Sequence, residues 1–354
     1  MNILVIEDGC GSHIYGGALV KAFEESGVLV KHYKWGFLDI DLGLSFLEKL
    51  PNIYKRLENR YSFGFYISKI NAEIKRGVRE CMPSIVFIYR GRHIYPSTVR
   101  YLTEELGLTV FGYNNDDPFS GNYPRYFWRH YLKSLPYYSH VFSYRQKNIE
   151  DYLSLGIQSS LVRSYYLKDK NFPIENLPED CQYRSDVSFI GHYEADGRDK
   201  MLLSLLQNGV ALKIYGPEWH RSSLYSQLVE LLGYEIKPLK GADYNLAINA
   251  CKIALVFLSK INSDTYTRRC FEIPATKTMM LAEYTDDLVS LYEAGKEADF
   301  FSGQKELLEK IQYYLAENRY EMIGEAGYAR LLKDGHEVTD RCRQIIDYNN
   351  QVNA

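Results

Sequence analysis

The 354-residue sequence contains only six cysteines, and they are widely separated. There is no CxxC pair and no cysteine–histidine pair at the spacing of a zinc site. This distribution excludes a small disulfide framework and predicts reduced structural thiols in a cytoplasmic protein. It also predicts that the protein binds no metal.

Long apolar runs are also lacking. The longest lies near residues 253–258, far short of the roughly 18 residues that a membrane-spanning helix needs. The first residues, MNILVIEDGCG, have no basic region followed by a long apolar region, so they predict a β-strand and not a signal peptide. We therefore expect a soluble cytoplasmic protein, with a peripheral contact to the inner face of the membrane left open.

Familiar catalytic motifs are missing as well. The sequence has no P-loop and no pattern of a serine or cysteine triad. After the first predicted strand, Gly9, Gly11, Gly16 and Gly17 do not have the spacing of a dinucleotide-binding fingerprint. Any chemistry must therefore come from a less regular arrangement of side chains.

The net charge is small but unevenly distributed. The formal net charge is −3, yet residues 1–168 carry +5 and residues 169–354 carry −8. The 46% of apolar and 25% of charged residues are typical of a globular protein, and the length favours two domains. The unequal charges indicate that the two halves meet different partners.

Short apolar runs alternate with helical patterns along the whole chain, which is typical of parallel α/β sheets. In the first half, strands are predicted at 2–6, 28–33, 84–89, 108–113 and 140–143, and helices at 17–26, 96–106 and 145–155. In the second half, strands are predicted at 186–191, 210–215, 253–258, 278–282 and 297–301. Helices are predicted there at 198–207, 222–232, 286–293, 304–316 and 320–348.

The alternation predicts an α/β protein with two Rossmann-like domains facing a cleft. Residues 166–185 contain two prolines and several charges without a clear period, which indicates a linker. The predicted parts are a domain at 1–168, a linker at 169–185, a second domain at 186–335, and a closing helix and tail at 336–354. Ligands of such sheets bind beyond the carboxyl ends of the strands.

The most informative segment for chemistry is 259–284, SKINSDTYTRRCFEIPATKTMMLAEY. A predicted strand leads there into a polar loop and a short helix with Arg268, Arg269 and Glu272. A carboxylate in this position can accept both hydroxyls of a ribose, and the arginines can meet phosphate oxygens. An ordinary surface pair of glutamate and arginine is the alternative.

The string RRCFEIPATKTMMLAEYTDDLVSLYEAGKEADFF resembles the C-terminal signature of CgeB-like, spore-maturation type glycosyltransferases. These enzymes are related to the family 4 glycosyltransferases and have the GT-B fold. The segments DVSFIGHYEADGRDKMLLSLLQNG, LKIYGPEW and GHEVTDRCRQII are similar to further parts of the same domain. Upstream, PSIVFIYRGRHIYPSTVRYL and TVFGYNNDDPF resemble the N-terminal domain of some members.

The resemblance implies transfer of a sugar from a nucleoside-diphosphate sugar, with UDP favoured, to a hydroxyl of a glycan, a lipid-linked glycan or another cellular acceptor. It implies no cofactor, no metal and retention of the anomeric configuration. One alternative is an acceptor among hydroxymethylated bases of DNA. Another is a non-catalytic protein that binds nucleotide sugars.

The resemblance also implies roles for residues of the second domain. Glu272 matches the second glutamate of a family E-x7-E motif and would bind the nucleotide ribose, and Asp264 stands where relatives have the first glutamate of that motif, which contacts the donor sugar. Arg198, or alternatively Lys200, would neutralise the leaving diphosphate. Other residues predicted to contact the donor are Gly191, His192, Tyr215, Gly216, Trp219, Arg268 and Lys277, the last replacing a glycine of the family. Trp219 would stack on the base or pack at the domain edge.

In the first domain, Asp116 and Asp117 directly follow a predicted strand. They would bind an acceptor hydroxyl or act as a general base, or they would form an Asx turn before Pro118. His13 is a further candidate base. Residues predicted to hold an anionic donor or acceptor are Arg90, Arg92 and His93.

Two segments of the first domain combine basic and aromatic residues. Residues 54–80 contain seven Lys/Arg against three Glu, and residues 123–168 contain seven against two acidic residues. Such mixtures dock on lipid headgroups or bind nucleic acid. The alternative is an ordinary amphipathic helix whose basic tips reach into water.

Overall fold

The computed structural model describes residues 1–36 and 52–352 and divides into two compact units. The first unit comprises residues 1–163 and 338–354, and the second comprises residues 164–337. The chain therefore passes from one unit to the other twice. The segment predicted as a linker, 169–185, belongs to the second unit, where the Phe172 amide donates to the Asn245 side chain at 3.3 Å.

The first unit is built on a six-stranded sheet in the order β2-β1-β3-β4-β5-β6, in which all neighbours are parallel. Its strands are β1 (Asn2–Glu7), β2 (Leu29–Lys34), β3 (Ile85–Tyr89), β4 (Thr109–Asn114), β5 (His140–Ser143) and β6 (Ser159–Leu161). Every residue of the central strand β3 is buried, as expected for an apolar run covered on both faces. The edge strand β2 is more polar and partly exposed.

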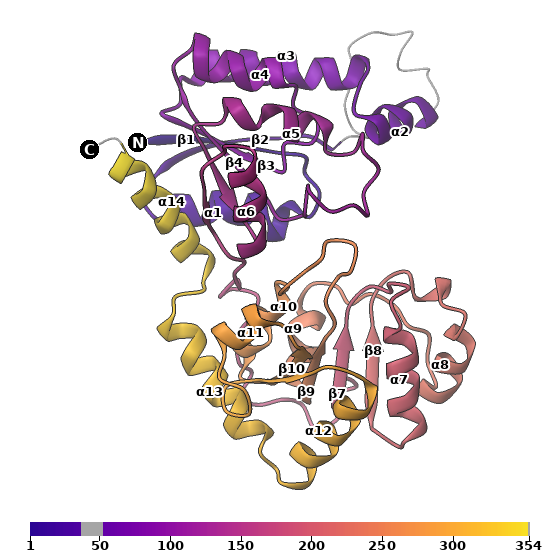
Figure 1. The fold of residues 1–354 in the computed structure, drawn as a ribbon. Helices are drawn as coiled ribbons and strands as arrows, with labels where there is room; N and C mark the ends of the chain where they lie inside the picture. The colour runs from indigo at the N-terminus through magenta and orange to yellow at the C-terminus, as the bar shows by residue number, and fades with distance from the viewer. Residues whose placement is uncertain (37–51, 353–354) are drawn as a thin grey trace. The chain divides into compact units, whose positions relative to one another are not determined.

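Helices cover both faces of this sheet (Figure 1). They are α1 (Gly16–Glu25), α2 (Asn52–Tyr61), α3 (Phe65–Cys81), α4 (Pro96–Arg100), α5 (Arg129–Ser134), α6 (Gln146–Ser154) and α14 (Val338–Val352), with a π-helix at Tyr101–Glu105. Helix α3 packs Ile70 and Ile74 into the core beside Val86 of β3. On the opposite face Phe23 of α1 meets Phe87 at 6.2 Å between ring centroids.

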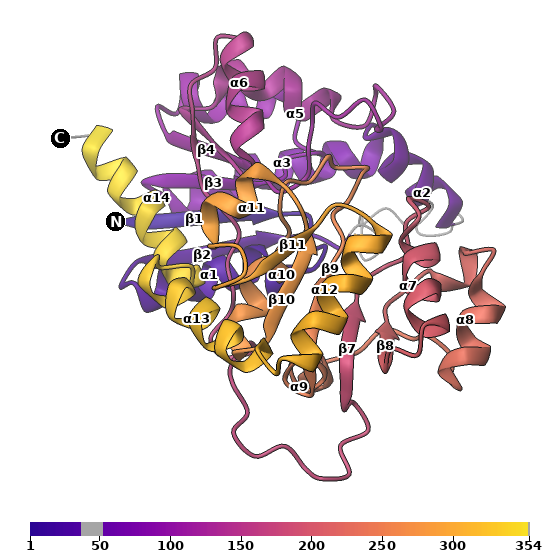
Figure 2. The same ribbon diagram turned by 60° about the horizontal axis from the view of Figure 1, so that its bottom comes forward.

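Helix α14, the predicted closing helix, returns to the first unit at the end of the chain. It lies beside α1 (Figure 2), and Cys342 contacts the Leu19 carbonyl there. Its Tyr348 stacks on His140 of β5 with ring centroids 4.0 Å apart. The C-terminal residues thus complete the hydrophobic covering of a sheet that begins at residue 2.

The second unit has a five-stranded parallel sheet in the order β11-β10-β9-β7-β8. Its strands are β7 (Ser185–Ile190), β8 (Leu212–Tyr215), β9 (Cys251–Val256), β10 (Met279–Glu283) and β11 (Asp299–Phe301). Its helices are α7 (Arg198–Gln207), α8 (Tyr225–Leu232), α9 (Ala242–Asn249), α10 (Arg269–Glu272), α11 (Asp286–Leu291), α12 (Gln304–Ala316) and α13 (Tyr320–Lys333).

The prediction of two Rossmann-like domains is confirmed, with differences in detail. Helix α9 and strand β6 were not predicted, and neither was the α2–α3 hairpin. The predicted helix at 320–348 is two helices, α13 and α14, that belong to different units. Gly335, with φ of 66°, lies between them, and this backbone conformation ends a helix. Among the residues described, no helix is long and apolar enough to cross a membrane.

Candidate functional site

The loops at the carboxyl ends of β7, β8 and β9 surround a hollow of about 400 Å³ in the second unit. Its lining combines both charges: His192, Glu194 and Asp196 after β7, Glu218 and Arg221 after β8, and Lys260 after β9. Parallel strands bring these loops to one edge of the sheet although they are far apart in sequence. The sequence predicted His192 here but missed Glu194 and Lys260.

Two glycines let the loops after β7 and β8 meet. A Cβ atom on Gly216 would lie 1.9 Å from the carbonyl oxygen of Gly191, and Gly216 has φ of 147°, which side chains rarely allow. The Gly191 amide donates to the Tyr215 carbonyl at 2.8 Å. Gly191 and Gly216, predicted as donor-binding residues, therefore have at least a structural role in joining the loops.

Trp219 also connects the loops that follow β7 and β8. Its side chain is 1% exposed, and its Nε1 donates to the Gly191 carbonyl at 2.9 Å. Its ring packs against Phe189 and Tyr193. Tyr215 is also buried, between Tyr183 and Tyr234, and burial raises the pKa of its hydroxyl. The structure therefore shows the packing role that was predicted for Trp219. The rings of Trp219 and Tyr215 are both buried, so neither has an exposed face on which a base could stack.

Glu194 is the central carboxylate of the hollow. It accepts a hydrogen bond from His192 Nε2 at 2.7 Å and from the Lys260 amide at 3.1 Å. Burial by itself raises the pKa of Glu194, but hydrogen bonds from His192 and Ser259, with the charge of Arg198, outweigh burial and lower the pKa to about 2. Glu194 is therefore ionised at neutral pH and links the loops after β7 and β9.

Arg198 is the first residue of α7 and packs against the loop that follows β7. Its side chain is 1% exposed. Its Nε and Nη2 donate to both oxygens of Asp196, at 2.9 and 2.7 Å, and its Nη1 donates to the His192 carbonyl at 2.9 Å. Because the protein already uses these donors, Arg198 braces the loop in this structure. Direct neutralisation of a diphosphate by Arg198 stays a prediction that would require these bonds to rearrange. The alternative cation, Lys200, follows in the first turn of α7 and is exposed.

Glu272 and Arg268 form an ion pair of 2.9 Å at α10. The other oxygen of Glu272 accepts a hydrogen bond from Tyr244 of α9 at 2.6 Å, and the carboxylate is almost fully buried. The neighbouring Arg269 donates to the Ile190 carbonyl at 3.0 Å, which attaches α10 to the carboxyl end of β7. Asp264 lies in the loop before α10, with its amide bonded to the Ser259 carbonyl at 2.9 Å. The carboxylate of Glu272 is thus held rigidly at the predicted edge of the sheet.

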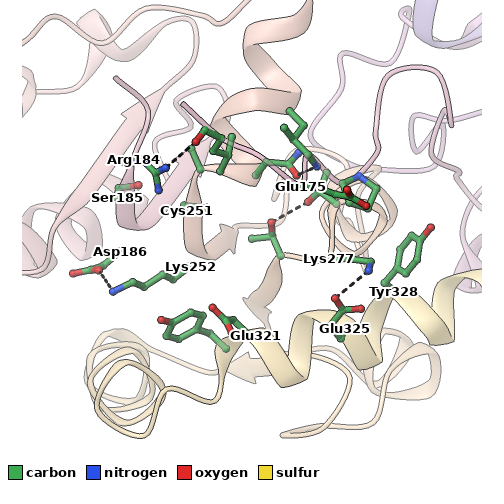
Figure 3. Close-up of a pocket in the computed structure, with 18 of the residues that line it drawn as sticks. Glu175, Arg184, Ser185, Asp186, Cys251, Lys252, Lys277, Glu321, Glu325 and Tyr328 are labelled. Carbon is green, nitrogen blue, oxygen red and sulfur yellow. Dashed lines mark hydrogen bonds and ion pairs between the residues drawn. The ribbon is translucent and has the colours of Figure 1, made fainter. Parts of the chain in front are cut away.

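Lys277 lies at the opposite edge of the sheet, which corrects its predicted contact with the donor. It precedes β10 and lines a broad hollow of about 1040 Å³ at the amino ends of the strands (Figure 3). Lys277 pairs with Glu325 at 3.0 Å, and Lys252 pairs with Asp186 at 2.7 Å. The missing family glycine is replaced there by a lysine with φ of 62°.

In the first unit, Arg90 joins the carboxyl ends of three strands. It follows β3, and its guanidinium lies 2.7 Å from Asp116 after β4 and 3.3 Å from Asp8 after β1. Burial lowers the pKa of Arg90, but the two carboxylates outweigh it and raise the pKa. Arg90 has φ of 66°, a conformation that costs energy for a residue with a side chain. The structure therefore brings the predicted residues Arg90 and Asp116 together.

Asp117 forms the Asx turn that was one of its three predicted roles. Its Oδ1 accepts from the Phe119 amide at 3.0 Å and from Asn148 at 2.9 Å, and Lys147 lies 2.6 Å from its Oδ2. The side chain is fully buried. These contacts contradict a general base at Asp117, because its carboxylate is enclosed and paired.

The remaining predicted residues of this domain have different environments. His93 is buried against Trp35, and burial and Arg92 lower its pKa to about 3, so a role as an anion-binding cation is contradicted. Arg92 donates to the Asn59 carbonyl at 2.6 Å, and burial lowers its pKa to about 10. His13 is exposed in a short 3-10 helix after β1, and its role as a base stays a prediction.

A buried carboxylate at the end of β1, Glu7, was not predicted from the sequence. Glu7 Oε1 accepts from Ser12 and from His32 Nε2, the latter at 2.8 Å. A Cβ atom on Gly16 would lie 2.3 Å from the Glu7 carboxyl group, so α1 begins with a glycine. The pair Gly16-Gly17 was the available signal for this close packing. The part of the chain that the structure describes contains no cluster of three metal-ligating side chains.

Comparisons with known proteins agree with this arrangement. A family described as glycosyl transferase-like matches residues 198–347. Sucrose-phosphate synthase from Thermosynechococcus elongatus shares 14% identity, covering 99% of both chains with a TM-score of 0.72. Anabaena Alr3699/HepE in complex with UDP-glucose shares 11% identity, covering 99% of this chain and 100% of that chain with a TM-score of 0.68.

The fold is shared with an enzyme of another class as well. UDP-GlcNAc 2-epimerase from Neisseria meningitidis, bound to UDP-GlcNAc, shares 10% identity, covering 99% of this chain and 100% of that chain with a TM-score of 0.61. No curated protein matches the sequence. The predicted GT-B fold is confirmed, and the family match with this fold supports a glycosyltransferase as the class of enzyme.

Glu194 makes the stability of the second unit dependent on pH. A carboxyl group whose pKa is lowered from 4.5 to about 2 stabilises the folded state above pH 4.5 and loses this contribution as the pH falls toward 2. We expect Glu194→Gln to flatten the decline of the unfolding free energy in this range, measured by urea unfolding at several pH values. Glu309→Gln, at a carboxylate that is 62% exposed, is the matched control. Equal pH slopes for wild type and Glu194→Gln would contradict the assignment.

Proposed function

We propose that this glycosyltransferase moves a sugar from a nucleoside-diphosphate sugar, with UDP as the favoured nucleotide, to a hydroxyl group. The observation that carries the proposal is the carboxyl edge of the second sheet. There Glu272 of α10 is held by Arg268 and Tyr244, and Arg269 attaches α10 to the end of β7, the strand that leads into the loop of His192 and Glu194. The neighbour with UDP-glucose has the same fold and supports a donor of this kind. The CgeB-like subtype rests on the sequence motifs.

The second unit would hold the donor. Glu272 would accept hydrogen bonds from the ribose hydroxyls, which requires its nearly buried carboxylate, now bonded to Arg268 and Tyr244, to become accessible to the ligand. Loop amides, Lys260 and His192 would stabilise the diphosphate as it gains charge on leaving. In this arrangement Lys260, which was not predicted from the sequence, and His192, which was, replace Arg198 in direct contact, and Arg198 positions the loop through Asp196. Side chains then supply the positive charge that a metal supplies in other transferases.

The first unit would bind the acceptor through Asp116, Arg90 and His13. During transfer the bond between the anomeric carbon and the diphosphate oxygen breaks, and a bond to the acceptor oxygen forms. The acceptor proton leaves with a diphosphate oxygen if the configuration is retained. If the configuration is inverted, Asp116 or His13 would accept the proton, because Asp117 is enclosed.

The decisive experiment combines binding with turnover. We expect UDP to raise the melting temperature more than GDP, TDP or CDP, because a bound ligand stabilises the folded state by mass action. A panel of UDP-sugars is then incubated with glycan acceptors, lipid-linked acceptors and hydroxymethylated DNA, and free UDP and glycosylated product are measured.

The outcomes separate the alternatives. UDP release that depends on an acceptor supports transfer, and the productive acceptor identifies the substrate class. Binding of UDP-sugars without release under every combination would favour the non-catalytic alternative. Conversion of the donor into an isomeric UDP-sugar, without any glycosylated acceptor, would replace the transferase with an epimerase.

A further inference from the structure

Helix α2 lies at the edge of the first unit (Figure 1), and its apolar side chains are exposed. Ile53 and Leu57, one helical turn apart, are 59% and 46% exposed, and Tyr54 and Tyr61 extend the same face. The following turn adds Phe63, and α3 begins with Phe65, which is 68% exposed. Residues 53–65 thus hold six of the 20 large hydrophobic side chains that are exposed among the residues described. A concentration of this kind marks an interaction site.

Basic side chains surround this face. Arg56 and Arg60 are exposed on α2, and Lys55 lies over the ring of Tyr66 at 5.1 Å. A second segment contributes exposed Arg125 and the partly buried Arg129, whose guanidinium lies 5.6 Å from the Phe63 ring centroid. We call the apolar residues 53, 54, 57, 61, 63 and 65 together with the basic residues 55, 56, 60, 125 and 129 the α2 patch.

The two segments of the α2 patch are firmly connected. The rings of Tyr61 and Tyr126 have centroids 5.0 Å apart, and Arg129 Nη2 donates to the Tyr61 carbonyl at 2.6 Å. Glu58 is the one acidic residue of α2, and its carboxylate accepts from the amides of Phe65 and Tyr66 at 3.1 and 2.8 Å. The negative charge of Glu58 is therefore bound by the first amides of α3, and the net charge of the α2 patch is positive.

We propose that the α2 patch docks the protein on an anionic lipid surface. Apolar side chains enter the boundary between headgroups and acyl chains, while the surrounding arginines and lysines meet lipid phosphates. Aromatic residues beside basic ones suit this boundary, because their rings are apolar and their hydroxyl groups or neighbouring cations stay in water. The charge complementarity favours an anionic membrane over an apolar protein partner. This docking is separate from the sugar transfer proposed above.

The test is cosedimentation of the full-length protein with vesicles. We expect binding to vesicles of mixed phosphatidylglycerol and phosphatidylcholine, and much weaker binding to pure phosphatidylcholine or at high salt. Arg56→Glu/Arg125→Glu should reduce the partition coefficient at least about tenfold, because each basic residue near such a surface contributes substantially. Ile53→Ser/Phe65→Ser should reduce binding at every salt concentration. Leu153→Ser/Leu155→Ser, which alters exposed leucines elsewhere in this unit, is the apolar control, and Lys305→Glu is the charge control.

Three results would overturn the proposal: absence of binding to anionic vesicles, equal binding to anionic and neutral vesicles, or an equal loss of vesicle binding in the patch variants and the control variants. Salt-dependent binding to duplex DNA without binding to vesicles would assign the patch to nucleic acid. A patch variant that changes only the sedimentation coefficient of the free protein would assign it to a second copy of the chain. Melting temperatures and UDP binding of all variants show whether the fold and the donor site are intact.

Discussion

Arg198→Ala is expected to lower the free energy of unfolding by about 3–5 kcal/mol, because it leaves a nearly buried carboxylate without its partner. The Asp196 side chain is only 8% exposed and receives three hydrogen bonds from the Arg198 guanidinium. The His192 carbonyl also loses its donor. Urea unfolding measures the loss, and turnover should fall with it, because the loop after β7 would no longer be held.

The matched control for Arg198 is Arg221→Ala. Arg221 pairs with Glu218 at 2.8 Å, but its side chain is 62% exposed, so we expect a change below about 0.5 kcal/mol. An Arg198→Ala protein with unchanged unfolding and lost turnover would show that Arg198 meets the diphosphate directly. Contact with the diphosphate, which the sequence predicted for Arg198, would then replace stabilisation of the loop after β7 as its function.

Glu272→Ala should weaken UDP binding about 10- to 100-fold, since a hydrogen bond to a charged group contributes about 1.5–3 kcal/mol. The carboxylate is oriented by Arg268 and Tyr244 before any ligand arrives, which reduces the cost of binding. Titration calorimetry with UDP measures the effect. Tyr244→Phe, which keeps the carboxylate but removes one of its bonds, should weaken binding to a smaller extent.

Glu325→Ala is the control for Glu272. Glu325 also pairs with a cation, Lys277, but it lines the hollow at the amino ends of the strands. UDP affinity should be unchanged in this variant. Unfolding is measured in parallel, because Glu272→Ala also removes the partner of Arg268. Native UDP affinity in a stable Glu272→Ala protein would remove Glu272 from the donor site.

Local patterns in the sequence predicted most strands and the order of the elements. A parallel strand that is buried on both faces has a continuous apolar sequence. The apolar runs 85–89 and 253–256 could therefore be predicted as strands from their composition alone. Helix α9 was not predicted, because its short sequence ADYNLAIN carries little apolar periodicity. Helix α2 lies in residues 54–80, where an amphipathic helix was only the alternative to a segment that binds lipid or nucleic acid, so its bounds were not predicted.

The candidate site was predicted less completely than the fold. The strand order placed Glu272, Arg268 and His192 at one edge, because the residues after parallel strands share an edge. The same rule places Lys277 at the opposite edge of the sheet, because Lys277 precedes its strand. Lys277 was nevertheless predicted to contact the donor, because it matches a position of the family motif. Glu194 and Lys260 lie in segments that the sequence singled out, but only the hydrogen bond from the Lys260 amide to Glu194 in the structure identified these two residues as part of the site.

The sequence by itself determined the two α/β sheets and the class of chemistry, since both depend on local patterns and on motifs in order. The tertiary structure decided which charged groups remain available to a ligand. Asp117 is enclosed by Lys147, Arg198 by Asp196, and Glu7 by His32. Whether a carboxylate or guanidinium serves a substrate or braces a loop depends on partners brought close by folding, because burial and pairing fix its hydrogen bonds and its charge.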